Sequence, residues 1–209
     1  MNAQTMTMAH RDGETSTPRL VVLLSGGGRT LLNLADNIDA GQLRAEIALV
    51  IASRPCVGVE RARARGFDTR VIAGDIPAAA LERLLDDARA DWVALAGYLR
   101  LVAIPQAYKG KVVNIHPALL PRFGGPGMYG AKAHQAVLDA GARESGCTVH
   151  LCDSGYDTGP IVLQKRCPVL PDDTVKTLAD RVFALEKLAY PEALRLLFAD
   201  ARQSARVKP

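Results

Sequence analysis

Short apolar runs alternate with amphipathic segments along most of the chain. The apolar runs are continuous, as in strands of a parallel sheet that are buried on both faces. Between them, apolar residues recur at the three- and four-residue spacing of helices. Glycine ends several segments, for example at Gly66 and Gly97. The pattern predicts strands at 20–24, 47–52, 69–73, 92–96 and 111–115, and helices near 31–38, 59–65 and 77–89.

The rhythm changes after Pro117. A glycine-rich loop covers 121–130, a helix is predicted near 131–140, and two strands follow at 147–152 and 161–167. The turn-rich connection between these strands is short enough for an antiparallel pair. A long helix is expected at 174–199, starting at Asp173 or Thr174 and bent or divided by Pro191. We therefore expect an α/β fold, with a doubly wound, mostly parallel sheet, helices on both faces and an antiparallel strand pair toward the C-terminus.

The two ends of the chain lack this pattern. Residues 1–18 are polar and aperiodic, which predicts a disordered N-terminal tail. Residues 201–209 are polar and basic, and we expect a flexible C-terminal tail there. The remaining part, 19–200, has the size of a single domain.

The composition narrows the class of protein. Apolar residues make up 48% of the chain and charged residues 23%, as in globular proteins with a sizeable core. No apolar run approaches the roughly 18 residues of a membrane span, and no secretory signal is recognisable. The four cysteines have no metal-binding spacing. We expect a cytoplasmic protein with reduced thiols, no metal and no membrane partner.

The net charge is compatible with a small anionic ligand. There are 26 Lys and Arg against 22 Asp and Glu, but no run of basic residues. Aromatic residues are only 5% of the chain, too few for a platform that stacks single-stranded nucleic acid. A small phosphorylated ligand satisfies the charge equally well, so no nucleic-acid partner is expected.

The first candidate for chemistry is the glycine-rich turn between the first predicted strand and helix. Gly27 and Gly28 would let a ligand approach the backbone closely, and the N–H groups of the helix start favour an anion. Arg29 would add a charge and Thr30 a hydroxyl. The turn matches neither the dinucleotide-binding fingerprint nor the Walker loop. Phosphate binding and a purely structural tight turn are both open interpretations.

The second candidate is the pair Asn114 and His116, at the carboxyl end of a predicted strand that Pro117 terminates. Residues i and i+2 of a strand share a face, so the amide and the imidazole project into one space. Ligands of open parallel sheets bind at that edge. An amide donor beside a titratable imidazole suits an oxyanion and its proton. The alternative is a pair satisfied by hydrogen bonds of a turn.

The third candidate is the loop that contains Asp153 and Asp157. Either carboxylate could orient the imidazole of His116, stabilise its charged form or accept a proton through water. An ionised carboxylate beside the ring would raise the pKa of His116. Turn chemistry alone also explains Asp and Gly in this loop. We expect His134 and His150 to have core or supporting roles.

Taken together, these motifs resemble the signature of folate-dependent formyltransferases. The specific part is Asn-Ile-His-Pro at 114–117, Leu-Leu-Pro at 119–121 and Asp-x-Gly-Pro at 157–160, in that order. The turn at 25–31, Leu-Ala-Gly-Tyr-Leu-Arg at 95–100 and Glu-x-x-x-Tyr-Pro at 186–191 extend the resemblance to about 20–198. Two features depart from it. Arg29 and Thr30 replace a small polar pair, and the loop 123–130 is longer and richer in glycine.

The resemblance implies roles for particular residues. Asn114, His116 and Asp157 would be catalytic, Glu186 would bind a ribose, and the Leu120–Pro121 peptide bond would be cis. The substrate phosphate would be held by Gly27, Gly28, Arg29 and Thr30. The folate would be bound by Tyr98, Leu99, Arg100, Leu101, Val102, Cys152 and Asp153.

The implied activity is transfer of the formyl group of 10-formyltetrahydrofolate to the amine of glycinamide ribonucleotide, in purine biosynthesis. The products would be formylglycinamide ribonucleotide and tetrahydrofolate, with no metal, in a monomer or a homodimer. Alternatives are another amine or water as the acceptor, or a non-catalytic nucleotide-binding module. Related methionyl-tRNA formyltransferases carry an added C-terminal domain, and formyltetrahydrofolate deformylases an N-terminal one. We expect neither here, and assign 19–200 to a single catalytic domain.

Overall fold

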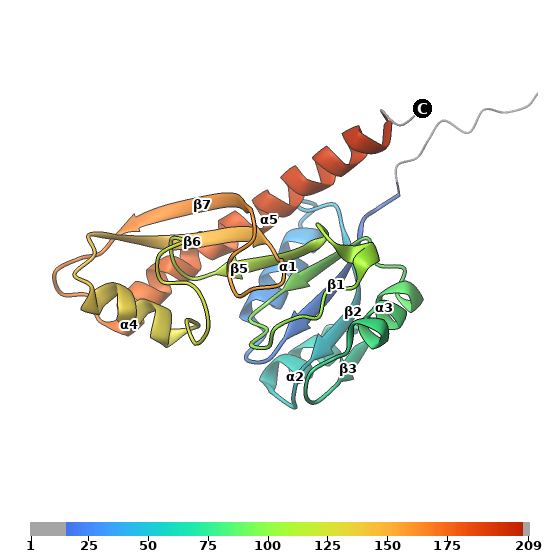
Figure 1. Ribbon diagram of the computed structural model, residues 1–209, viewed down its shortest axis with the longest axis horizontal. Helices are drawn as coiled ribbons and strands as arrows, with labels where there is room; N and C mark the ends of the chain where they lie inside the picture. The colour runs from blue at the N-terminus through green and yellow to red at the C-terminus, as the bar shows by residue number, and fades with distance from the viewer. Residues whose placement is uncertain (1–15, 207–209) are drawn as a thin grey trace, which may run out of the picture.

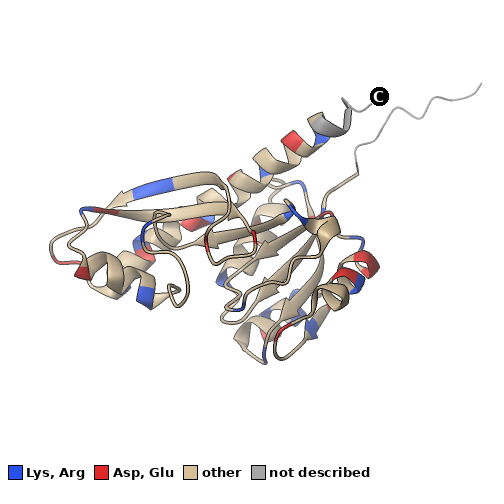
Figure 2. Cartoon of the chain, in the orientation of Figure 1, with Lys and Arg blue, Asp and Glu red and all other residues tan. Residues whose placement is uncertain are grey.

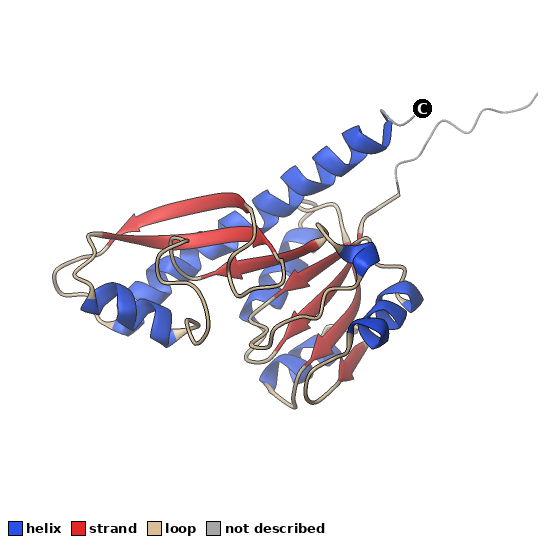
Figure 3. Ribbon diagram, in the orientation of Figure 1, coloured by secondary structure: helices blue, strands red, loops and turns tan. Residues whose placement is uncertain are grey.

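A seven-stranded sheet forms the centre of the computed structural model, which describes residues 16–206 (Figures 1 and 3). Its strands are β1 (Arg19–Leu24), β2 (Glu46–Ala52), β3 (Thr69–Val71), β4 (Trp92–Leu95), β5 (Val112–His116), β6 (Glu144–Leu151) and β7 (Ile161–Pro168). The order across the sheet is β3-β2-β1-β4-β5-β6-β7. The pairs from β3 to β5 are parallel, whereas β6 runs antiparallel to both β5 and β7. The predicted fold class is confirmed.

Helices cover both faces of the sheet (Figure 3). They are α1 (Arg29–Asp39), α2 (Val57–Ala64), α3 (Ala78–Asp87), α4 (Ala131–Asp139), α5 (Val175–Arg206) and the 3₁₀ helix η1 (Gln106–Tyr108). Alternate residues of β1 point to opposite faces. Leu20, Val22 and Leu24 share one core with α1, α2, α4 and α5, whereas Val21 and Leu23 share the other with α3 and η1. The continuous apolar run of β1 is therefore buried on both sides.

The sheet order reverses direction at β1, and this reversal locates the candidate site. The chain proceeds from β1 outward to β3, and then returns to place β4 on the other side of β1. Since β1, β4 and β5 are parallel, their carboxyl ends meet at one edge. Ligands of doubly wound sheets bind at such a switch point. The segments that leave this edge are 25–28, 96–102 and 117–130.

Helix α5 differs from the expectation at two places. It is one continuous helix with Pro191 inside it, so the proline does not divide it. Tyr190 and Ala193 beside the proline are fully buried, and this packing compensates for the missing backbone N–H. The helix also continues to Arg206, so 201–206 is helical where a flexible tail was predicted. The helix starts as expected, because the Thr177 N–H donates to Thr174 Oγ1 (3.2 Å).

The predicted N-terminal tail, 1–18, lies outside the described residues except for 16–18, which have no regular structure. No helix within 16–206 has the length and apolarity that crossing a membrane requires. Basic and acidic residues are interspersed over the helices in the view of Figure 2.

Tyr190 connects α5 to the strands that carry the candidate site. Its buried hydroxyl donates to the carbonyl oxygens of Leu95 (3.1 Å) and Val113 (2.9 Å), at the ends of β4 and β5. Tyr190→Phe is expected to lower the free energy of unfolding by about 1–3 kcal/mol, because it leaves buried carbonyl groups without their donor. Urea unfolding measures this loss. The matched control is Tyr108→Phe, whose hydroxyl bonds the exposed carboxylate of Asp86 (2.9 Å) and should cost less. Equal losses would contradict the bridging role.

Candidate active site

The segments at the carboxyl edge of the sheet enclose a cavity of about 980 Å³. Its size is typical of sites for small molecules. All the residues singled out from the sequence line it: Gly27, Gly28, Arg29, Thr30, Tyr98, Leu99, Arg100, Leu101, Val102, Asn114, His116, Cys152, Asp153, Asp157 and Glu186. The structure thus brings the three sequence candidates into one space.

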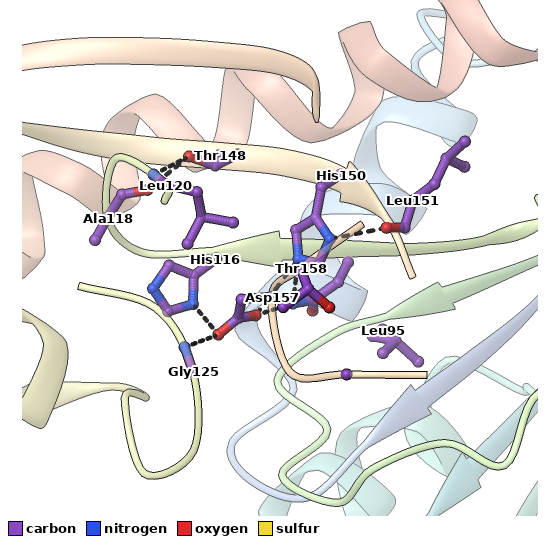
Figure 4. A network of polar contacts seen from close by, with 12 residues as sticks. Leu95, His116, Ala118, Leu120, Gly125, Thr148, His150, Leu151, Asp157 and Thr158 are labelled. Carbon is purple, nitrogen blue, oxygen red and sulfur yellow. Dashed lines mark hydrogen bonds and ion pairs between the residues drawn. The ribbon is translucent and has the colours of Figure 1, made fainter. Parts of the chain in front are cut away.

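The carboxylate of Asp157 joins Asn114 and His116. Figure 4 shows this carboxylate beside His116 and Gly125. Its Oδ1 lies 3.3 Å from the Asn114 amide nitrogen, and its Oδ2 lies 3.3 Å from His116 Nδ1. The shared face that the i, i+2 spacing in β5 predicts is therefore present. Asp157 adopts a left-handed backbone conformation (φ 59°), which Asp and Asn tolerate better than most residues.

The structure also distinguishes the two acids of the loop. Asp153 Oδ1 accepts from the backbone N–H of Gly155 (2.9 Å) and from the hydroxyl of Thr158 (2.6 Å). These hydrogen bonds lower the pKa of Asp153, and the bond from Thr158 has the larger effect. Asp153 thus organises its own turn, and Asp157 is the acid that reaches His116.

The glycine-rich loop after β5 covers His116 and Asp157. The Phe123 carbonyl oxygen lies 2.8 Å from His116 Nε2, and the Gly125 N–H donates to Asp157 Oδ2 (3.0 Å). Gly124 makes this close approach possible, because a β-carbon there would lie 2.4 Å from a methyl group of Leu120 and 3.2 Å from Asp157 Cβ. The unusual glycine content of 123–130 therefore has a steric reason at this position.

Both ring nitrogens of His116 face oxygen atoms. A carbonyl oxygen only accepts, so Nε2 carries the proton that bonds Phe123. A second proton on Nδ1 would complete the contact with Asp157, and the contacts therefore favour imidazolium. The ring is only 3% exposed, however, and this burial lowers the pKa of His116 because it outweighs the opposing effects of Asp157 and Phe123. The expectation of a raised pKa is wrong in its net direction, although Asp157 acts with the expected sign.

Burial would raise the pKa of Asp157, but three contacts reverse the direction. The hydrogen bond with His150, the charge of His116 and the N–H of Gly125 together hold the pKa of this carboxyl below its usual value. Asp157 is therefore ionised at neutral pH. A fixed negative charge thus stands beside a buried imidazole, as stabilisation of a transient imidazolium requires.

His150, on β6, supports the group from behind. Its Nδ1 donates to the carbonyl of Leu151 (3.0 Å), and its Nε2 lies 3.1 Å from the amide nitrogen of Asn114. The same nitrogen lies 3.4 Å from Asp157 Oδ1. The supporting role expected for His150 agrees with these contacts.

A hydrogen-bond network holds the turn that follows β5 (Figure 4). The buried Thr148 hydroxyl donates to the Ala118 carbonyl (2.7 Å) and accepts from the Leu120 N–H (3.1 Å). The Gln164 amide donates to the Leu120 carbonyl (2.9 Å). The Leu120–Pro121 bond is cis, as expected.

The glycine turn presents backbone donors to the cavity. The carbonyl groups of Gly26, Gly27 and Gly28 accept hydrogen bonds from Gly58, Arg61 and Leu32. In the part of the chain that the structure describes, the N–H groups of 26–30 donate to no recorded protein acceptor. Gly28 has φ 73°, and a β-carbon there would lie 2.9 Å from Gly58 Cα. The turn therefore requires glycine and leaves its N–H groups available for an anion.

Glu186 faces the same end of the cavity from α5. Burial raises the pKa of Glu186 to about 7, and the positive charge of Arg29 acts in the opposite direction. The carboxyl group thus titrates near neutral pH, and its ionised form accepts hydrogen bonds from hydroxyl groups.

Several cavity residues were not singled out from the sequence. Lys176 and Phe183, for example, line the cavity from α5. Phe183 lies one helical turn before Glu186, a spacing that the sequence already contains. His134, which was assigned a core or supporting role, is only 4% exposed yet also borders the cavity. Within 16–206, no three His, Cys, Asp or Glu side chains are grouped to hold a metal ion.

Comparison with known proteins extends the resemblance. The model of the formyl transferase family matches residues 18–194. The chain is 39% identical to the chloroplastic phosphoribosylglycinamide formyltransferase of Arabidopsis thaliana, over 90% of this chain and 68% of that protein. It is 42% identical to the trifunctional purine biosynthetic protein adenosine-3 of Drosophila pseudoobscura pseudoobscura, over 91% of this chain. The chain spans only 14% of the length of that trifunctional protein.

A solved structure agrees with these sequence matches. Glycinamide ribonucleotide transformylase 1 from Symbiobacterium toebii resembles the fold with a TM-score of 0.80 at 39% sequence identity. The match covers 89% of each chain, and so includes both the parallel part of the sheet and the antiparallel strand pair.

Proposed function

Because this chain belongs to the formyl transferase family, we propose that it is a phosphoribosylglycinamide formyltransferase. It transfers the formyl group of 10-formyltetrahydrofolate to the primary amine of glycinamide ribonucleotide. The observation that carries this proposal is the contact of Asn114 and His116 with the single carboxylate of Asp157, inside a cavity that also holds the glycine turn.

Asn114, His116 and Asp157 have different roles in the proposed formyl transfer. Asn114 donates a hydrogen bond to the formyl oxygen, which gains negative charge as the amine adds to the formyl carbon. His116 in its protonated form stabilises that charge and gives the departing folate nitrogen the proton it needs. Asp157 stabilises the charged ring and, through water, helps to remove the proton of the amine. Each protein group acts on charge that develops only during the reaction.

The two substrates would occupy different ends of the cavity. The N–H groups of the glycine turn, together with Arg29 and Thr30, hold the phosphate, and Glu186 accepts from the ribose hydroxyls. The folate lies along 98–102 and against Cys152 and Asp153. In this proposal the amine and the formyl group meet beside Asn114 and His116.

One assay separates this function from its alternatives. The protein is incubated with 10-formyltetrahydrofolate, with and without glycinamide ribonucleotide, and the folate absorbance is followed. Turnover that depends on the ribonucleotide supports the proposal, whereas equal turnover without it indicates a hydrolase. Turnover only with another amine changes the acceptor, and no turnover with any acceptor supports a binding module.

Arg29→Ala is expected to raise KM for the ribonucleotide about tenfold or more, with KM for the folate nearly unchanged. The reason is the loss of a charge-assisted hydrogen bond, worth about 1.5–3 kcal/mol. Steady-state kinetics with each substrate varied measures the effect. Arg63→Ala is the matched control, since Arg63 is exposed on α2 and outside the cavity wall. An unchanged KM would leave phosphate binding to the backbone N–H groups alone.

A further inference from the structure

The guanidinium group of Arg29 lies over the ring of Phe183. Arg29 Cζ is 3.6 Å from the ring centroid, well inside the range of a cation–π contact. Arg29 is the first residue of α1 and Phe183 lies within α5, so the contact joins two elements far apart in the sequence. Both side chains line the main cavity.

Stacking leaves the donors of Arg29 available. A guanidinium carries five N–H donors, and its attraction to an aromatic ring requires none of them to bond an acceptor atom. Within 16–206, no ion pair or hydrogen bond ties the Arg29 side chain to a protein acceptor. Carboxylates do tie other arginines of this chain, namely Arg19, Arg65, Arg100 and Arg181. The ring thus holds the Arg29 guanidinium without using the groups that bind an anion.

The acidic residues near Phe183 explain why the position of the Arg29 guanidinium needs support. Asp180 lies one helical turn before it on α5 and Glu186 one turn after it, so both carboxylates share its face of the helix. Arg29 interacts electrostatically with each of them. A long side chain free to turn would pair with one of these carboxylates and neutralise its own charge. Contact with the ring gives the guanidinium a third partner that does not neutralise its charge.

We propose that Phe183 is a positioning residue that presents Arg29 to the phosphate group of the acceptor substrate. The proposal rests on the function proposed above and adds a determinant of acceptor affinity to it. The observation that supports it is the contact between Arg29 and Phe183 in the cavity wall, in addition to the position of Arg29 at the N-terminus of α1. The ring itself has no part in the chemical step, so its removal affects binding of the phosphorylated substrate and leaves kcat nearly unchanged.

Phe183→Leu tests this role because it keeps an apolar side chain and removes the aromatic face. KM for glycinamide ribonucleotide is expected to rise about 3- to 10-fold, with kcat and KM for the folate nearly unchanged. Phe183→Tyr keeps the aromatic face and should restore wild-type KM. Urea unfolding of each variant measures any effect on stability separately.

A double-mutant cycle distinguishes positioning from packing. In the Arg29→Ala background, Phe183→Leu should cause no further rise in KM. Binding of ribose 5-phosphate, measured by calorimetry in the same four proteins, should show the same pattern without any need for turnover. If wild type binds ribose 5-phosphate with this coupling but transfers no formyl group, the proposed function fails and the role of Phe183 stands.

Three outcomes would overturn the proposal. In the first, Phe183→Leu changes neither KM nor the affinity for ribose 5-phosphate. In the second, Phe183→Leu raises KM and lowers the affinity for ribose 5-phosphate by the same factors with and without Arg29, which would mean that the ring acts through packing alone. In the third, wild type does not bind ribose 5-phosphate, and the pair then serves no phosphate.

Discussion

Asn114→Ala is expected to lower kcat about 10²–10³-fold, with both KM values nearly unchanged. In the proposed mechanism the amide donates to an oxygen that carries full negative charge only during the reaction, so removing the amide destabilises the transition state. Single-turnover and steady-state measurements of formyl transfer give the two constants separately.

The matched control for this variant is Asn33→Ala, which removes the same amide from α1 outside the cavity wall. Its kcat should remain that of the wild type. Because Asn114 also contacts His150, the stability of Asn114→Ala should be measured alongside. A kcat near the wild-type value in a folded Asn114→Ala protein would show that another group binds the oxyanion.

Asp157→Asn is expected to lower kcat/KM about 10²-fold or more, because the charged form of His116 loses its counterion. Asn has nearly the same shape as Asp and also tolerates the left-handed backbone at this position, so the fold should persist. The variant therefore isolates the charge. The measurement is kcat/KM as a function of pH.

The direction of the pH effect follows from the surroundings of His116. Burial lowers the pKa of the ring, and the Asp157 carboxylate is the largest influence that raises it. Without that charge the pKa of His116 falls further, so the protonated ring is lost at a lower pH. The alkaline limb of the profile should therefore move to lower pH if it reports His116.

Asp153→Asn is the control for this shift. Asp153 lies in the same loop but bonds Gly155 and Thr158, so the limb should stay in place. If the limb moved equally in both variants, a general change of charge in the loop would explain it. A limb that stayed in place in Asp157→Asn would assign it to another titrating group.

Local sequence patterns predicted the fold class and the shared face of Asn114 and His116. The apolar runs of β1, β2 and β4 are strands because residues buried on both faces must be continuously apolar. The spacing of Asn114 and His116 predicts a shared face, because side-chain direction alternates along any strand. These features depend on neighbours in the chain, which is why the sequence alone determines them.

Contacts between distant segments were decided only by the tertiary structure. The chemistry of the loop alone left Asp153 and Asp157 as equivalent partners for His116, and the resemblance pointed to Asp157. The path of the loop over β5 separates the two carboxylates. The net direction of the pKa of His116 depends on how much solvent the glycine-rich loop excludes, which has no local signature. Likewise, Arg29 meets Phe183 because α1 and α5 pack on the same face of the sheet. Burial and through-space charge depend on all the neighbours of a group, and the fold alone assembles them.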